Sequence, residues 1–436
     1  MPRQGWRILG SIAYRHLFRR LPESLYISMS DRIAESLAAL AAGVLAPLAR
    51  PKVGARPARL KIGFISTNFG NHAVGQVALD LFAALDHSRF ELHAISRWDR
   101  SAEPQPYHRR MRSAFDGFHE WGIYAPSEIS RRVRALGIDI LVDLHGYMDH
   151  ASPEILACRP APVQVFWLGH AGGLAVDACD YLICDAVTVP AGEERRYRQC
   201  VARLPEIYHC ASPHPIAAPP TRAECGLPDS GFVFCAFNNP EKIDRAAFAA
   251  WMDILCASEG SVLWLSDPGA MASRSEYLRR AAAAHGVEPK RLVFAGWAPD
   301  KDTHLARHAH AGMLLDTFTL NASTTALDAL WAGCPVLTMR GHDFASRIAG
   351  TMLHAIGLDD MIAADLPAYR AAAVRLSRDP AALAAIKSRL AANRATHPLF
   401  DVRRFARHFE MALETMWSKH MAGEKPRDFD VAPLER

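Results

Sequence analysis

The chain has 436 residues, which is too many for one ordinary domain and enough for two or three. Half of the residues are hydrophobic and 22% are charged, so a disordered chain is excluded. The formal net charge of +4 is small for this length and gives no support to nucleic-acid binding, which needs clustered basic residues.

Residues 1–58 are predicted to form a short helical leader. Residues 1–20 mix arginines with apolar side chains, which is typical of a helix that packs on the main body or touches a membrane surface. The longest apolar run, residues 37–49, contains Gly43 and Pro47 and is too short to span a bilayer. The N-terminus also lacks the pattern of a signal peptide. We therefore expect no transmembrane segment.

The 9 cysteines are an odd number and form no CxxC pair. This pattern disfavours both a disulfide framework and a zinc site, and it favours a reducing compartment. The sequence therefore predicts a cytoplasmic protein.

Residues 59–215 are predicted to form an N-terminal Rossmann-like domain. Its first strand covers Leu60–Ser66, and later apolar runs alternate with helical stretches. Such alternation indicates a parallel sheet with helices on both faces. Further strands are predicted at residues 91–96, 138–144, 163–168 and 180–184, and helices at 77–85 and 127–136.

A cluster of prolines at residues 213–220 indicates a domain boundary. A second Rossmann-like domain is expected at residues 222–400, then a closing helix at 401–420 and a loose tail at 421–436. The predicted fold class is α/β, with two doubly wound domains facing a cleft. Ligands of such sheets bind beyond the carboxyl ends of the strands. Strands of the second domain are predicted at residues 232–237, 262–265, 292–294, 313–316 and 335–339, and helices at 245–257, 274–284, 325–331, 345–355, 368–376 and 381–393.

A helix start rich in hydroxyl groups carries the sharpest functional signal. Ser323, Thr324 and Thr325 follow a predicted strand and open a helix. Free backbone N–H groups and the helix dipole at such a start suit a diphosphate. Asp328, one turn into the helix, could accept hydrogen bonds from ribose hydroxyls. An ordinary N-cap is the alternative interpretation.

Two further patches of the second domain are candidates for the same ligand. Lys242 lies just past a strand, where it could place a cation on a departing phosphate. A surface lysine is the alternative, although a helix start is electrostatically poor for one. His304 and Arg307 lie three residues apart on one predicted helix face, which suits a nucleobase and its phosphates. The alternative there is a solvated helix face.

In the first domain, His72 follows the first strand and is expected to face the cleft. It could act as a base or bind a phosphate, and an ordinary capping histidine is the alternative. Gly169, His170 and Gly172 also follow a strand. Glycines there either let a ligand approach the backbone closely or form plain turns.

Competing motifs are weak. The chain holds no GxGxxG, P-loop or GxSxG pattern. Asp139 and Asp143 share a strand that should be buried, so we interpret them as strand-end residues and not as a metal pair. The DxD pattern at residues 428–430 falls in the expected loose tail.

Several segments together resemble the catalytic region of glycosyltransferase family 41, the family of O-GlcNAc transferase and SPINDLY. Their order and spacing agree over roughly residues 60–420, and the set is specific although each motif is weak alone. The matching segments are IGFISTNFGNH (62–72), ILVDLHGY (140–147), RPAPVQVFWLG (159–169), DYLICD (180–185), FNNPEKI (237–243), STTALD (323–328), LWAGCP (330–335) and ASR (345–347).

The resemblance implies an inverting transferase of GT-B type that uses no metal and no other cofactor. It implies that His72 lies near the reaction centre and that Lys242 stabilises the departing diphosphate, with Asn239 as its polar neighbour. The other matching positions belong to the nucleotide and acceptor parts of the site. They are Lys301, His304 and Arg307 for the nucleotide, Ser323, Thr324 and Thr325 at the phosphate-binding helix start, Asp328 for the ribose, and Gly169, His170 and Gly172 on the acceptor and sugar side.

This sequence departs from the family pattern at sugar and acceptor contacts. The segment GGLA at 172–175 stands where many relatives carry GTSG, and Gln76 replaces a second histidine. Ser323 stands where a histidine commonly precedes the threonines, and one residue near Asp300 is inserted. These changes bear on the donor sugar more than on the reaction class.

The family's tetratricopeptide array is not expected here, because only about fifty residues precede the first strand. The preferred hypothesis is transfer of GlcNAc from UDP-GlcNAc to Ser or Thr hydroxyls of a protein acceptor. One alternative keeps the fold with another donor or acceptor, namely GDP-fucose, flagellin or an N-linked site. The other alternative is a catalytically silent module that binds a nucleotide-sugar.

Overall fold

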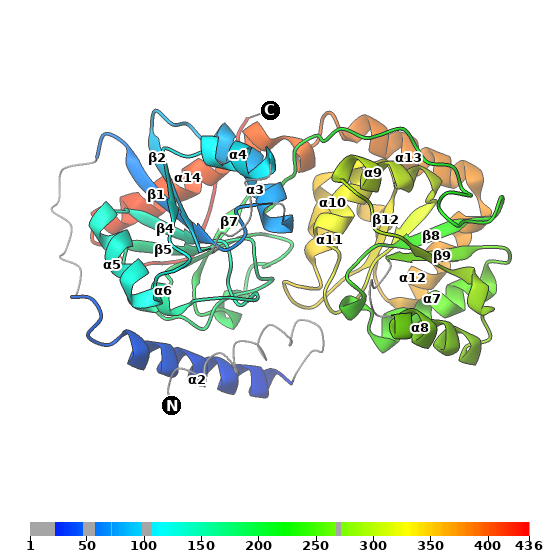
Figure 1. The fold of residues 1–436 in the computed structure, drawn as a ribbon, viewed down its shortest axis with the longest axis horizontal. Helices are drawn as coiled ribbons and strands as arrows, with labels where there is room; N and C mark the ends of the chain where they lie inside the picture. The colour runs from blue at the N-terminus through cyan, green and yellow to red at the C-terminus, as the bar shows by residue number, and fades with distance from the viewer. Residues whose placement is uncertain (1–21, 47–56, 71, 98–105, 267–271, 436) are drawn as a thin grey trace. The chain divides into compact units, whose positions relative to one another are not determined.

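The computed structural model describes residues 22–46, 57–70, 72–97, 106–266 and 272–435 (Figure 1). The chain folds into two compact units. Unit 1 comprises Met1–Ala211 and Asp401–Arg436, and unit 2 comprises Ser212–Phe400. The chain leaves unit 1 just before its proline-rich segment and returns to it for the C-terminal helix. The amphipathic pattern predicted at residues 1–20 lies outside the described residues.

Unit 1 is built on an eight-stranded sheet in the order β14-β7-β6-β5-β4-β1-β2-β3, and all paired strands are parallel. The central strands β4, β5 and β6 are buried along their whole length, as expected for parallel strands between layers of helices. The strands are β1 Leu60–Ser66, β2 Phe90–Ser96, β3 Gly117–Glu120, β4 Ile140–Asp143, β5 Val163–Phe166, β6 Tyr181–Asp185, β7 Cys200–Leu204 and β14 Phe429–Asp430.

The C-terminal helix α14, Val402–Met421, packs against α3, Ala73–Ala84, and is anchored by aromatic side chains. The ring of its Phe409 lies 4.7 Å from the ring of the buried Trp167, which follows β5. Phe64 of β1 contacts Phe82 of α3 at the same centroid distance, 4.7 Å. Burial of these large rings ties the returning helix to unit 1.

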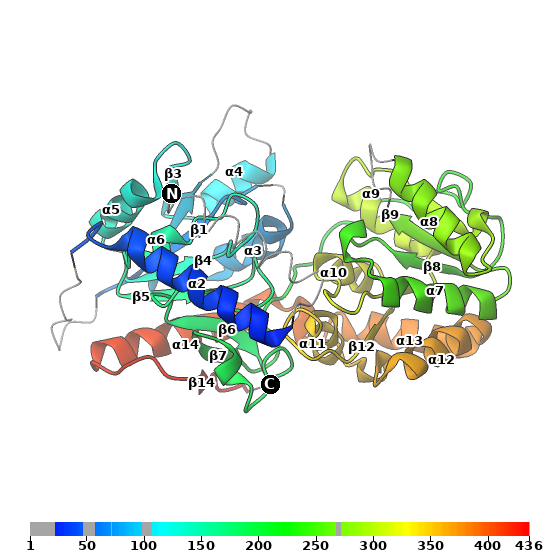
Figure 2. The same ribbon diagram turned by 90° about the horizontal axis from the view of Figure 1, so that it is seen from below.

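The remaining helices of unit 1 include α2, which lies beside α6 in Figure 2. Met29, Ile33 and Leu37 form its buried face. Their spacing of four residues is that of one face of a helix. The helices are α2 Glu23–Ala41, α4 Pro106–Ser113, α5 Pro126–Leu136 and α6 Glu154–Ala157.

Unit 2 holds a six-stranded sheet in the order β10-β9-β8-β11-β12-β13, again with parallel pairs. The strands are β8 Val233–Ala236, β9 Val262–Ser266, β10 Leu292–Ala295, β11 Met313–Leu315, β12 Val336–Met339 and β13 Ile362–Ala363. The α-helices are α7 Arg245–Ala257, α8 Ala272–Ala284, α9 Lys301–Ala306, α10 Thr324–Trp331, α11 Ile348–Ala355, α12 Leu366–Arg378 and α13 Pro380–Asn393.

Both sheets contain the doubly wound strand order. If the first six strands of each sheet are numbered along the chain, they lie in the order 3-2-1-4-5-6. The predicted α/β class with two Rossmann-like domains is therefore confirmed, while the predicted cleft between them stays a prediction. The winding reverses between β1 and β4 in unit 1, and between β8 and β11 in unit 2. Doubly wound sheets bind ligands at this switch point.

Several local features differ from the prediction, among them the strands β7 and β13, which were not predicted. The tail was expected to be loose, but β14 pairs with β7 and Asp428 accepts the Val201 N–H at 2.8 Å. The edge strand β3 was missed because its residues are only partly buried and form no apolar run. The helix predicted through Arg307 ends at Ala306, and Arg307 begins the short 3-10 helix η4, Arg307–His310.

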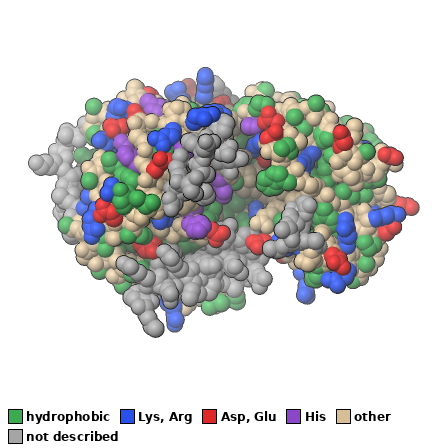
Figure 3. Space-filling view, viewed as in Figure 1, with side chains coloured by type: hydrophobic (Ala, Val, Ile, Leu, Met, Phe, Trp, Pro, Cys, Tyr) green, Lys and Arg blue, Asp and Glu red, His purple; other side chains and the backbone are tan. Residues whose placement is uncertain are grey.

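The visible face of the molecule carries charged side chains of both signs among hydrophobic ones (Figure 3). On the face drawn in Figure 3, acidic and basic side chains are interspersed, in line with the small net charge. Within the described ranges, every helix is too short or too polar to qualify as a bilayer-crossing segment.

Candidate functional site

The candidate site of unit 2 lies at its switch point, where the segments after β8 and β11 meet. The first segment forms the short 3-10 helix η2, Pro240–Lys242, and the second leads into α10. Lys242 Nζ donates to the carbonyl oxygen of Asn321 at 2.7 Å. Lys242 therefore contacts the segment that ends in Ser323 and Thr324, which is the arrangement that a shared diphosphate site needs.

Lys242 is partly buried, and the fully buried Asp316 is the first residue after β11. Burial lowers the pKa of Lys242 to about 8, while the charge of Asp316 acts in the opposite direction. Burial raises the pKa of Asp316 to about 6, against the hydrogen bonds that it accepts from Ala322 and Thr338. At pH 7 the crevice thus holds a cation and an anion.

The start of α10 has no side-chain cap. Ser323 is the N-cap residue, but its hydroxyl makes no capping hydrogen bond among the described residues. Thr324 and Thr325 are half-buried at the same end. The Ala326 N–H donates to the Ser323 carbonyl oxygen at 2.9 Å, so the N–H groups of Thr324 and Thr325 and the helix dipole are left for an anion. The interpretation of Ser323 as an ordinary side-chain cap is wrong.

Two side chains of α9 contact Asp328, which lies one turn into α10. Lys301 Nζ is 2.7 Å from Asp328 Oδ1, and His304 Nε2 is 3.9 Å from Asp328 Oδ2. Both partners of the closer pair are mostly shielded from solvent. A hydroxyl that binds Asp328 would therefore also lie close to an ammonium group.

Phe237, the first residue after β8, is the centre of a cluster of flat side chains. The rings of His304 and His308 pack against it at centroid distances of 5.8 and 5.2 Å. The guanidinium carbon of Arg307 lies 5.7 Å from the same centroid. Burial and the charges of Arg307 and Lys301 lower the pKa of His304 to about 4, so its ring is neutral at pH 7. Such flat, uncharged surfaces next to a guanidinium suit a nucleobase.

Asn239 holds the turn that ends in Lys242. It is the N-cap residue of η2, and its Oδ1 accepts the Glu241 N–H at 3.0 Å. Asn239 therefore has a local structural role, which is to cap the turn that carries Lys242.

Three residues of this region were not among the predicted site residues: Phe237, His308 and Asp316. Phe237 was placed at the end of a predicted strand and in a family motif, but was given no role in the site. His308 lies four residues after His304, a helical spacing that could have revealed it. Asp316 was assigned to the end of a predicted strand, and nothing in the neighbouring sequence marks it.

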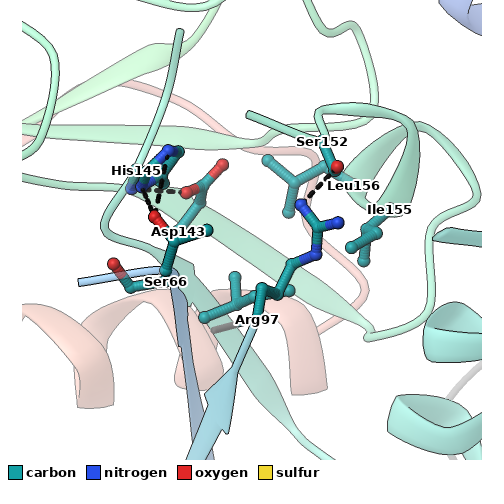
Figure 4. Close-up of a pocket in the computed structure, with 9 residues that line it drawn as sticks. Ser66, Arg97, Asp143, His145, Ser152, Ile155 and Leu156 are labelled. Atoms are coloured by element: carbon teal, nitrogen blue, oxygen red, sulfur yellow. Dashed lines mark hydrogen bonds between the residues drawn. The ribbon is translucent and has the colours of Figure 1, made fainter. Parts of the chain in front are cut away.

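The switch point of unit 1 is lined by polar side chains, which Figure 4 shows around a small pocket. His145, in the turn after β4, places Nε2 2.7 Å from the Asp149 carbonyl oxygen and Nδ1 3.1 Å from the Thr67 hydroxyl. Because a carbonyl oxygen only accepts, Nε2 carries the proton and Nδ1 accepts from Thr67. Burial lowers the pKa of His145 to about 4, which keeps the ring neutral.

Asp143, the last residue of β4, organises the turn that follows it. Its Oδ1 accepts the N–H groups of His145 at 2.6 Å and Gly146 at 3.2 Å. Burial raises the pKa of Asp143 to about 6. The pocket beside Asp143 and Arg97 offers about 10 Å³ to a water-sized sphere, the room that one buried water needs. Asp139 accepts the Lys61 N–H at 2.9 Å, so Asp139 and Asp143 both bind backbone N–H groups.

His72 is the N-cap residue of α3. Its Nδ1 accepts the Val74 N–H at 3.2 Å, so the neutral ring carries its proton on Nε2. Burial lowers the pKa of His72 and favours this neutral form. The alternative interpretation of His72 as a capping histidine is therefore correct for its Nδ1 atom. Nε2 is a donor suited to a phosphate or sugar oxygen.

The predicted acceptor-side residues have structural reasons of their own. A Cβ at Gly169 would lie 2.1 Å from the Leu144 carbonyl oxygen, so only glycine fits there. His170 is buried with its ring 5.3 Å from the ring of Tyr147. Gly172 has a φ of +142°, and a Cβ built on it would meet nothing within 4 Å. Among Gly169, His170 and Gly172, it is therefore Gly172 that leaves room for a ligand.

No group of three His, Cys, Asp or Glu side chains in the described part of the chain is placed to share a metal ion. The metal-independence implied by the family resemblance stays a prediction.

A comparison with known proteins shows which family this chain resembles. The sequence model of Glycosyl transferase family 41 matches residues 46–216 and 211–409. The probable UDP-N-acetylglucosamine–peptide N-acetylglucosaminyltransferase SEC of Arabidopsis thaliana is 33% identical over 384 residues, which is 86% of this chain and 38% of that protein. The probable enzyme of the same description named SPINDLY, from Oryza sativa subsp. japonica, is 30% identical over 380 residues, which is 86% of this chain and 40% of that protein.

Solved structures agree with this relationship. A mutant O-GlcNAc transferase of Thermobaculum terrenum superposes with a TM-score of 0.86 at 28% identity, covering 96% of this chain and 78% of that one. Anabaena HepE in complex with UDP and glucose has a TM-score of 0.53 at 13% identity, covering 82% and 100%, and is similar in fold alone.

This chain spans 38% and 40% of the length of the two plant relatives. The family model matches most of this chain, and both units have the parallel sheets of GT-B transferases. The chain belongs to glycosyl transferase family 41.

Proposed function

We propose that this chain transfers a sugar from a UDP-sugar to a Ser or Thr hydroxyl of a protein, with UDP-GlcNAc as the donor. The observation that carries the proposal is the contact of Lys242 with the segment that leads into α10, because it puts an ammonium group beside an uncapped helix start. The choice of donor and acceptor is supported by the names of SEC and SPINDLY, which describe transfer of N-acetylglucosamine to peptides.

In the proposed reaction, the acceptor oxygen forms a bond to the anomeric carbon while the bond from that carbon to the diphosphate breaks. Negative charge develops on the departing UDP. Lys242 and the N–H groups at the start of α10 are placed in advance to stabilise this charge. Attack from the face opposite to UDP inverts the anomeric configuration. With these groups on the diphosphate, the reaction proceeds without a metal ion.

The nucleoside binds, in this proposal, between α9 and α10. The base lies against His304 and Phe237, and Arg307 completes the flat surface. The ribose hydroxyls bind Asp328, and Lys301 leaves its present partner to share them. This arrangement uses Lys301, His304, Arg307 and Asp328, which the sequence predicted for the nucleotide and its ribose.

The proton of the acceptor hydroxyl goes, in this proposal, to a phosphate oxygen of the donor. His72 is a poor candidate for the base, because its Nδ1 already accepts a backbone N–H and its Nε2 carries a proton. We assign His72 the role of a hydrogen-bond donor to the substrate. Gly172, with open space at its backbone, is proposed to contact the sugar or acceptor.

We further propose that the protein works in the cytoplasm. All 9 cysteines are free, and most are buried, which supports a reducing compartment.

A nucleotide panel tests the proposal. Thermal shift and calorimetry with UDP, GDP and CMP should show clear stabilisation and tight binding with UDP, because a ligand stabilises the fold more the tighter it binds. Labelled UDP-GlcNAc with peptide acceptors then tests transfer. Tight binding of GDP or CMP alone would defeat the donor assignment. UDP binding without transfer or donor hydrolysis would favour a silent binding module.

A further inference from the structure

One peptide group in unit 2 is held between a cation and an anion. The Asn321 carbonyl oxygen accepts from Lys242 Nζ at 2.7 Å, and the N–H of the same peptide group, on Ala322, donates to Asp316 Oδ1 at 2.7 Å. In a trans peptide the two groups point in opposite directions, so the charges lie at opposite ends of one dipole and each strengthens the other's bond. The next residue, Ser323, is the N-cap of α10.

Asp316 is fully buried, and all of its oxygens have partners. Oδ1 also accepts the Thr317 N–H at 2.8 Å, and Oδ2 accepts the Thr338 hydroxyl at 2.7 Å. Its backbone carbonyl accepts the Tyr369 hydroxyl at 3.1 Å. Moving this carboxylate would leave several buried donors unsatisfied, which is costly. Asp316 is therefore a fixed point behind the crevice.

The loop from Asp316 to Ala322 is braced from within. Thr317 Oγ1 donates to the Leu320 carbonyl and Asn321 Nδ2 donates to the Thr317 carbonyl, both at 2.6 Å. Asn321 Oδ1 also accepts the Ala349 N–H at 3.3 Å. The position of Asp316 is thus transmitted through the loop to the start of α10.

We propose that Asp316 is a positioning residue of the transfer reaction, which holds the Asn321–Ala322 peptide group and Lys242 in one arrangement at the start of α10. The inference rests on the proposed function, in which Lys242 stabilises the departing diphosphate. Asp316 acts through Lys242 and the loop.

Two other titratable groups adjoin the pair in the described part of unit 2. Tyr369 binds the Asp316 carbonyl, and burial raises its pKa well above the usual range, so it stays neutral. Asp244 accepts from the Thr319 hydroxyl at 2.7 Å and also caps α7 through the Ala247 N–H. The charge that supports the protonated form of Lys242 against burial is that of Asp316.

Asp316→Asn separates the charge from the hydrogen bonds. An asparagine can accept the same two N–H groups through Oδ1 and donate to Thr338 through its amide, but it carries no charge. Lys242 then loses its proton at lower pH. We expect the basic limb of the kcat/KM profile to move down by about one pH unit or more, the effect of removing a close opposite charge.

A second readout does not depend on activity. In protein labelled with carbon-13 at lysine Cε and assigned with Lys242→Met, the NMR titration of Lys242 should move down by the same amount in Asp316→Asn. In the wild type, the Lys242 signal should also respond to the ionisation of Asp316 near pH 6. This wild-type response remains decisive if the variant fails to fold.

Thr338→Val and Tyr369→Phe are matched controls, because each removes one hydrogen bond to Asp316 and leaves its charge. Both should lower the melting temperature without moving the basic limb of the pH profile, because Asp316 keeps its charge at the pH where Lys242 titrates. A folded Asp316→Asn variant with an unmoved basic limb and an unmoved Lys242 titration would overturn the inference, as would a wild-type Lys242 signal indifferent to pH near 6. If the wild type transfers no sugar from any nucleotide-sugar, the proposed function fails, and the NMR titrations still decide whether the pair is coupled.

Discussion

The two switch-point crevices share one strand order but are held together differently. In unit 2, the buried Asp316 and the partly buried Lys242 form hydrogen bonds with the N–H and the carbonyl oxygen of one peptide group after β11. In unit 1, the corresponding place after β4 holds the neutral ring of His145 and the carboxylate of Asp143, which binds backbone N–H groups. The same topology therefore places an ammonium group at the crevice of one unit, and a neutral histidine ring beside a buried carboxylate at the crevice of the other. Strand-end residues, and not the winding of the sheet, set this difference.

Both crevices contain ionisable groups that reduce stability at pH 7. Asp143 and Asp316 have folded-state pKa values raised to about 6, so each contributes stability that is present at acid pH and lost as pH rises through 6. Lys242 has a pKa lowered to about 8, so its contribution is present at alkaline pH and lost as pH falls through 8. Groups that weaken the fold at working pH are typical of functional sites.

The largest expected effect separates the crevices by activity. Lys242→Met keeps an aliphatic side chain but removes the cation, so transfer should fall by about 100- to 1000-fold. His145→Gln in unit 1 can retain one of the hydrogen bonds and should lower transfer by less than about tenfold. Steady-state transfer of a labelled sugar measures both, and circular dichroism with a thermal melt verifies that each variant is folded. Equal losses in the two variants would remove the distinction between the crevices.

The next effect concerns the close approach of two backbone segments in unit 1, at Gly169 and Leu144. Gly169→Ala would push a Cβ against the Leu144 carbonyl oxygen, so we expect a loss of roughly 2 kcal/mol or more in the free energy of unfolding. Gly70→Ala is the matched control, because a Cβ there meets nothing within 4 Å. Urea unfolding measures both. A Gly169→Ala variant as stable as Gly70→Ala would show that the contact yields easily.

A smaller effect tests the nucleotide part of unit 2. Asp328→Asn should weaken UDP binding by about tenfold, because a hydrogen bond to a charged group is lost. Asp302→Asn is the control on the neighbouring helix, where Asp302 pairs with His214 at 2.9 Å. Calorimetry with UDP compares the two. Similar affinities of these variants would argue against a ribose contact at Asp328.

The smallest effect concerns the buried carboxylate of unit 1. Asp143→Asn can still accept the His145 and Gly146 N–H groups, but it carries no charge. At pH 8 the variant should melt higher than the wild type by about 2–4 °C, the size expected from roughly 1 kcal/mol. The difference should shrink towards pH 5, where the folded wild type takes up a proton at Asp143. Melting curves at both pH values measure this, and a gap that does not change with pH would contradict the assignment.

Much of the fold follows from local patterns. The strand over Leu60–Ser66 and the helix over Arg245–Ala257 were predicted at their observed bounds, because strands buried on both faces read as apolar runs and helices have a 3.6-residue period. The short edge strands β3 and β14 were not predicted, since they lie at the rims of the sheet and bury few side chains.

For the site, the order of residues along the chain shows which residue types follow the strand ends, and so Lys242, Thr324 and Asp328 could be named as candidates. Only folding brings Lys242 to Asn321, 79 residues away, and Asp316 to the other end of the same peptide group. Burial and pairing depend on residues that are distant in the chain. They set the charge and position of each group, and no local pattern encodes them.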